Sequence, residues 1–86
     1  MSMTEVRFAG FDAAGERGPI RWALFQHHEV TDVQLTAQPD TLRIEHRGRP
    51  DVEGWTSTLV HAGLPAPRVV SEHASSSADA LHGASA

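Results

Sequence analysis

A chain of 86 residues that contains no cysteine has few means of stabilising a fold. At this length, folding buries only about 60% of the surface that the unfolded chain exposes. Disulfides and thiolate metal sites are excluded, so histidine and carboxylate groups are the strong metal ligands that remain. The sequence therefore predicts a single domain with a small apolar core, which favours association with a second subunit.

The charge and hydropathy of the chain argue against two classes of function. The formal net charge is −4 at pH 7, whereas proteins that bind nucleic acid carry clustered cations. No apolar run approaches the ~18 residues of a membrane span, and the first ten residues lack the apolar segment of a signal peptide. We expect a soluble, cytoplasmic protein. All seven basic residues are arginine, a bias that is typical of GC-rich bacterial genomes.

The N-terminal two thirds of the chain reads as β-strands, because short runs of alternating apolar and polar residues are separated by turns. The segment QPDT has proline and aspartate in the order that a type I turn prefers, which predicts a hairpin. In the segment PIRWALFQH, alternation would place Ile20, Trp22 and Leu24 on the core face of a strand. Ala23 and Phe25 would then lie on the open face of the sheet. The predicted strands cover residues 4–11, 19–27, 31–37 and 41–47.

The apolar period changes from two residues to about 3.6 after the hairpin. Asp51 is suited to cap a helix, and Gly63 is typical of a helix end. The pattern predicts an amphipathic helix over residues 50–62 that packs Trp55 and Leu59 on the sheet. The predicted sheet face that receives them consists of Trp22, Leu24, Val33, Leu35 and Ile44.

These segments together predict an α+β fold, an antiparallel β-meander of about four strands with one helix packed on one face. Arg68, Val69 and Val70 would add a short final strand. The predicted domain covers residues 1–73. We expect residues 74–86 to form a disordered tail, because alanine, serine and glycine dominate them.

Adjacent histidines in the segment LFQHHEV raise the question of a metal site. On a strand, His27 and His28 would point to opposite faces and could not share one ion. His28 and His46 would lie at the same end of one face, separated by two strand spacings or roughly 9.5 Å. They are weak candidates for metal ligands, and a third ligand such as Glu29 would be needed. The alternative is that both are half-exposed histidines at the end of a sheet.

The sequence contains no motif that supports an enzyme. Phosphate-binding loops, dinucleotide-binding glycine patterns, zinc-protease helices and nucleophile elbows are all missing. Ser57 and His61 are one helical turn apart, but a solvated polar face explains them better than a nucleophile and its base. We expect a non-enzymatic protein without a cofactor.

Arginines are concentrated in the segment LRIEHRGRP, which holds Arg43, Arg47 and Arg49. On a connection between a strand and a helix, such arginines could contact phosphates. Nearby acidic residues, among them Glu45 and Asp51, could instead pair with them.

The leading hypothesis is a small accessory or protein-interaction protein that forms a homodimer. It would use the open face of the sheet around Ala23 and Phe25, or an exposed edge strand. A regulator that contacts nucleic acid through the arginine turn is the first alternative. A histidine metal-binding protein is the second.

Overall fold

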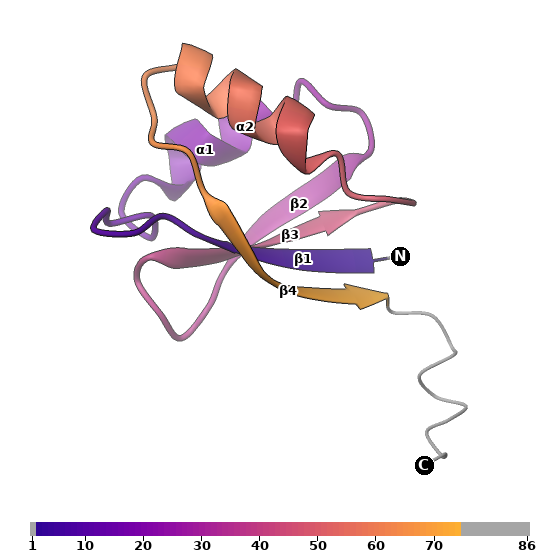
Figure 1. Ribbon diagram of the computed structural model, residues 1–86, viewed down its shortest axis with the longest axis horizontal. Helices are drawn as coiled ribbons and strands as arrows, with labels where there is room; N and C mark the ends of the chain where they lie inside the picture. Colours follow the sequence, from indigo (N-terminus) through magenta and orange to yellow (C-terminus); the bar gives the residue numbers. More distant parts are fainter. Residues whose placement is uncertain (1, 75–86) are drawn as a thin grey trace.

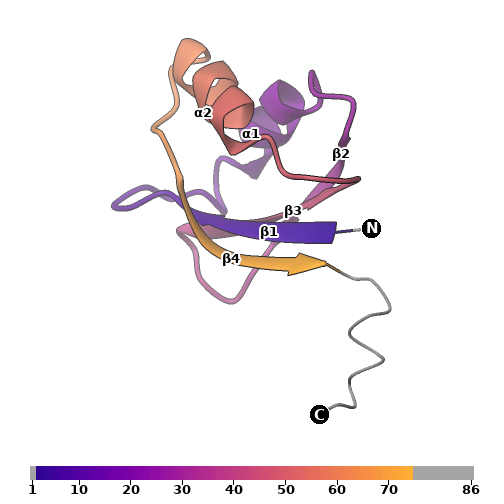
Figure 2. The ribbon, with the colours of Figure 1, turned by 45° about the vertical axis from the view of Figure 1, so that its right-hand side comes forward.

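Two helices cover one face of a four-stranded antiparallel sheet in the computed structural model, which describes residues 2–74 (Figure 1). The view in Figure 2, turned by 45°, shows both helices on the same side of the sheet. The predicted α+β class and the antiparallel four-stranded sheet are therefore confirmed. In chain order the elements are β1 (Ser2–Arg7), α1 (Arg17–Leu24), β2 (Val30–Leu35), β3 (Thr41–His46), α2 (Val52–His61) and β4 (Arg68–Ala74).

The strands are ordered β2-β3-β1-β4, so the sheet is not a meander. The predicted hairpin is present, because β2 and β3 pair through Val33 and Ile44 as well as Leu35 and Leu42. Each helical crossover passes over one strand: α1 connects β1 to β2 across β3, and α2 connects β3 to β4 across β1. This is the split β-α-β arrangement of ferredoxin-like folds. Such folds carry many unrelated functions, so the architecture does not identify one.

The segment expected to form a strand over residues 19–27 is instead helix α1, followed by a turn. Pro19 is tolerated because it lies in the first turn, where backbone N–H groups have no partner within the helix. Ile20, Ala23 and Leu24 are buried, and their spacing defines one helical face. Trp22 lies about 200° around the helix from Ile20 and is 80% exposed. Its expected place in the core is therefore wrong.

The core lies between the sheet and the two helices. Trp55 and Leu59 of α2 are at most 1% exposed, which confirms the predicted buried face of that helix. Leu35 was expected in the core but is 54% exposed at the end of the edge strand β2. The buried apolar residues are Val6, Phe8, Ala13, Ile20, Ala23, Leu24, Val30, Val33, Leu42, Ile44, Trp55 and Leu59.

Helix α2 begins and ends as the sequence predicts. The Asp51 side chain accepts a hydrogen bond from the backbone N–H of Gly54 at 3.1 Å, which caps the first turn. Gly63 has a φ of 85°, the left-handed conformation that ends many helices. A Cβ atom at Gly54 would collide with the Asp51 carboxylate, so this glycine makes room for the cap.

The predicted final strand is present and longer than expected, because β4 runs from Arg68 to Ala74 and pairs with β1. Ala74 was expected to be the first residue of the tail but belongs to β4. The other residues of the expected tail, 75–86, lie outside the described part of the chain. Neither described helix has the length and the apolar run that crossing a bilayer requires.

Candidate functional site

The outer side of α1 presents two aromatic side chains to solvent. Trp22 is 80% exposed and Phe25, which caps the C-terminus of the helix, is 39% exposed. Together with Gln26 they line a shallow hollow of about 220 Å³. The guanidinium of Arg21 lies 4.5 Å from the centre of the Phe25 ring, a cation–π contact that holds the ring in place. We call Trp22, Phe25 and Gln26 the α1 aromatic surface.

The helical period explains how this surface arises. Trp22 and Phe25 are three residues apart, so they lie on the same side of a helix. Because Ile20, Ala23 and Leu24 face the core, that side points outward. The i, i+3 spacing is the sequence signal that identifies the aromatic pair, once residues 17–24 are recognised as a helix.

Two of the predicted interaction residues occupy places other than those expected. Ala23 is 3% exposed in the core and contributes nothing to the surface. Phe25 is exposed, but at the end of α1 rather than on the open face of the sheet. That face carries charged side chains instead, including an ion pair of 3.4 Å between Arg43 and Glu5.

The three arginines of the predicted basic turn do not all lie on one side of the sheet. The Arg43 guanidinium pairs with Glu5, whereas Arg47 and Arg49 are exposed in the connection between β3 and α2. Arg49 lines a hollow together with Thr4. Neighbouring residues of a strand point to opposite faces, so Thr4 and Glu5 place Arg49 and Arg43 on opposite sides of the sheet.

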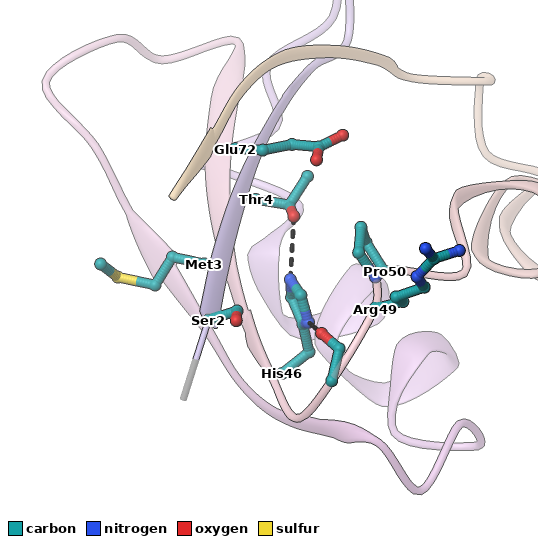
Figure 3. Close-up of a pocket in the computed structure, with 8 residues that line it drawn as sticks. Ser2, Met3, Thr4, His46, Arg49, Pro50 and Glu72 are labelled. Atoms are coloured by element: carbon teal, nitrogen blue, oxygen red, sulfur yellow. Dashed lines mark hydrogen bonds between the residues drawn. The ribbon is translucent and has the colours of Figure 1, made fainter. Parts of the chain in front are cut away.

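The hollow beside Arg49 measures about 480 Å³ and lies where β1 begins and β3 ends. Figure 3 shows its lining, with Glu72 of β4 and Arg49 coming from different elements. Two of the lining residues, Thr4 and His46, are joined by a hydrogen bond of 2.8 Å between Thr4 Oγ1 and His46 Nε2. The complete lining is Ser2, Met3, Thr4, His46, Gly48, Arg49, Pro50 and Glu72.

His46 is not the half-exposed histidine that the sequence suggests. It is 1% exposed, and its Nδ1 lies 3.0 Å from the backbone carbonyl of Gly48. A carbonyl only accepts, so Nδ1–H donates to it and Nε2 accepts from the Thr4 hydroxyl in the neutral ring. Both nitrogens are therefore engaged, and neither offers a lone pair to a metal. His28 lies in the exposed turn before β2 and not on a strand, so the strand geometry that placed it at the same end of one sheet face as His46 is wrong.

The structure instead brings together His27, Glu29 and Asp51, a group that the strand interpretation could not reveal. One potential ligand atom from each residue lies within 4.8 Å of the others. His27 Nδ1 is 3.7 Å from Glu29 Oε2, and the same oxygen accepts a hydrogen bond of 2.9 Å from Trp55 Nε1. The sequence predicts Glu29 as a possible third ligand beside His28 and His46, neither of which belongs to this group.

The electrostatic environment keeps Glu29 ionised. Burial raises the pKa of its carboxyl, but the hydrogen bond from Trp55, its own backbone N–H and the charge of His27 outweigh that effect. The net pKa of Glu29 is therefore lower than usual. A carboxylate in this position is ready to accept hydrogen bonds or to bind a cation.

The His61 side chain contacts the backbone of Ser57 and not its hydroxyl group. His61 Nδ1 donates to the backbone carbonyl of Ser57 at 2.8 Å, so this nitrogen closes a helical turn and does not engage the Ser57 hydroxyl.

No family model, curated protein or solved structure matches this chain. The described residues contain two candidate binding features: the α1 aromatic surface and the group of His27, Glu29 and Asp51.

Proposed function

We propose that this chain is a non-enzymatic, cytoplasmic protein-interaction protein that forms a homodimer through the α1 aromatic surface. The observation that carries the proposal is the 80% exposure of Trp22 beside Phe25. A tryptophan side chain buries about 150–250 Å² when it is covered, and tryptophan is enriched among the residues that dominate protein interfaces.

A second copy of the chain is the partner that this surface favours. Symmetric dimers use the same patch on both subunits, so the patch must be complementary to itself. The α1 aromatic surface offers an exposed indole and an apolar hollow of about 220 Å³ that the indole itself helps to line, which supports self-complementarity. Two copies related by a twofold axis could each place Trp22 in the hollow of the other.

The small core supports the same proposal. Only twelve apolar residues are buried among the described residues. A domain with such a core gains stability by covering its exposed aromatics with a second subunit.

The nucleic-acid alternative has less support, because Arg43 is paired with Glu5 and lies across the sheet from Arg49.

Light scattering coupled to size-exclusion chromatography tests the proposal. The wild-type protein should elute with the mass of a dimer at high micromolar concentration, and Trp22→Glu should elute as a folded monomer. Val70→Glu is the matched control, because Val70 is a 52% exposed apolar residue on β4, away from α1. A monomeric wild-type protein, or a dimer that survives Trp22→Glu, would overturn the proposal.

A further inference from the structure

We propose that His27, Glu29 and Asp51 bind one divalent transition-metal ion, with Zn²⁺ as the representative. The three residues come from two separate segments of the chain. His27 and Glu29 belong to the turn between α1 and β2, and Asp51 is the residue that caps α2. An ion at this site would connect the turn to the helix.

The geometry is close to that of a bound ion. Zinc lies about 2.0–2.2 Å from nitrogen and oxygen ligands, so ligand atoms in a tetrahedral site are about 3.4 Å apart. His27 Nδ1 and Glu29 Oε2 are already 3.7 Å apart, and all three ligand atoms fall within 4.8 Å of one another. Side-chain rotation alone can close the difference, because Asp51 is exposed and Glu29 is half-buried.

Residues outside the group hold two of the ligands in position. Trp55, which is 1% exposed, donates from Nε1 to Glu29 Oε2 at 2.9 Å. Thr58 Oγ1 lies 2.7 Å from His27 Nε2. Metal-binding histidines and carboxylates characteristically have such outer partners, which fix the orientation of the ligands. Both contacts come from α2 and leave His27 Nδ1 directed at Glu29.

The contact with Thr58 also suits the tautomer that a metal requires. A hydroxyl both donates and accepts, so Thr58 can satisfy His27 Nε2 in either tautomer. When Nε2–H donates to Thr58, the lone pair of His27 Nδ1 is free for the ion. The same histidine can therefore pair with Glu29 in the metal-free protein and bind the ion without losing its outer partner.

The donor set selects the class of metal. One imidazole nitrogen and two carboxylates suit Zn²⁺, Co²⁺ or Mn²⁺, whereas Mg²⁺ and Ca²⁺ prefer oxygen ligands throughout. Cu(I) prefers sulfur ligands, and this chain has no cysteine. Three protein ligands leave at least one coordination position for water or for a ligand from solution.

Calorimetric titration of the tag-free, full-length protein with ZnCl₂ tests the site. We expect one ion per chain, and an absorption spectrum of four- or five-coordinate Co²⁺ when CoCl₂ replaces ZnCl₂. His27→Gln, Glu29→Gln and Asp51→Asn should each weaken Zn²⁺ binding at least tenfold. Asp51→Asn keeps the helix cap, since asparagine caps as well as aspartate does. Thr58→Val, which removes an outer partner, should weaken binding by about 10–100-fold.

The matched controls are His28→Gln and His61→Gln, which change exposed histidines outside the group. Both should bind Zn²⁺ with wild-type affinity. Circular dichroism of each variant shows whether it is folded, so that a loss of binding reports on the ligands. The proposal is overturned if the wild-type protein shows no saturable binding. It is also overturned if His27→Gln binds as tightly as the wild type, or if His28→Gln abolishes binding.

Discussion

Trp55 joins three parts of the fold. Its side chain lies on the face of α2 that packs against the sheet and is 1% exposed. It donates to Glu29 in the turn before β2, and its ring packs against the His46 ring in a T-shaped arrangement, with the ring centres 5.3 Å apart. One side chain thus connects α2, the turn after α1 and the end of β3.

Replacing Trp55 with alanine should lower the free energy of unfolding by about 3–5 kcal/mol, because it removes a large core side chain and leaves a cavity. That loss is comparable with the whole stability of a small domain. His61→Ala, on the exposed side of the same helix, should change it by no more than about 0.5 kcal/mol. Urea denaturation measures both values. A tolerant Trp55 and a critical His61 would show that the buried face of α2 has been misassigned.

The buried pair of Thr4 and His46 shows why single residues are hard to interpret from sequence. Alternation correctly places His46 on the same face as Leu42 and Ile44, and all three are buried. The pattern cannot show that Thr4, from a strand far away in the chain, satisfies the ring at 2.8 Å. A buried polar group needs such a partner, and the sequence does not reveal which one it is.

At the scale of elements, the sequence predicts the β2–β3 hairpin, α2 and β4 but not α1. Ile20 and Leu24 fit both a strand, with a period of two, and a helix, in which residues four apart share a face. The choice depends on whether Trp22 or Ala23 joins them in the core. Hydrophobicity favours Trp22, whereas the structure buries Ala23. Short apolar runs are ambiguous for this reason.

Because the sequence predicts a strand where α1 lies, it also fails to predict the two candidate binding features. A strand over residues 19–27 separates Trp22 from Phe25 by placing them on opposite faces, whereas the helix brings them together. The same error fixed His27 on a sheet face, although it lies in a turn near α2. The group with Glu29 and Asp51 depends on that turn, so no local pattern could predict it.

Asp32 connects α1 to the edge strand β2 through its side chain. Its carboxylate accepts hydrogen bonds from the backbone of Val33 at 2.8 Å and from Arg21 of α1 at 3.3 Å. Burial raises the pKa of the Asp32 carboxyl, but these hydrogen bonds and the charge of Arg21 outweigh that effect, so the net pKa is lower than usual. The native state therefore holds this proton less tightly than the unfolded chain does.

The stabilisation from Asp32 should be fully present well above pH 3.8 and should be lost as the pH falls through the lower pKa of the folded state. Asp32→Asn should lower the free energy of unfolding near neutral pH. It should also flatten the dependence of that free energy on pH between about pH 5 and pH 2. Urea denaturation across this range measures the slope. Equal slopes in the wild type and the variant would show that Asp32 makes no such contribution.

At the scale of the whole molecule, the two sides of the fold differ in character. Both helices lie over one face of the sheet (Figure 2). The other face carries ion pairs such as Arg7 with Asp40, whose side chains are 2.8 Å apart. Those charges make the open face a poor surface for burial against a partner. The exposed aromatic rings lie on α1, so association would occur on the helical side of the molecule.

If the chain is a homodimer, its thermal stability should depend on protein concentration, because a dimer that dissociates on unfolding is favoured by mass action. The Tm of the wild type should rise as the concentration increases. The Tm of Trp22→Glu should stay constant. Differential scanning calorimetry over a wide range of concentrations measures both. A wild-type Tm that does not change with concentration would contradict a dimer of this kind.

The first and last strands of the fold lie next to each other. Ser2 of β1 is paired with Ala74 of β4, and Figure 1 shows these two strand ends side by side. The backbone therefore enters and leaves the sheet at one place on its rim. A short linker could join the two ends into a ring without breaking a strand pair, and new ends could be opened in the exposed turn after Leu35. The same geometry allows this unit to be inserted into a surface loop of a host protein, with both connections made at a single point.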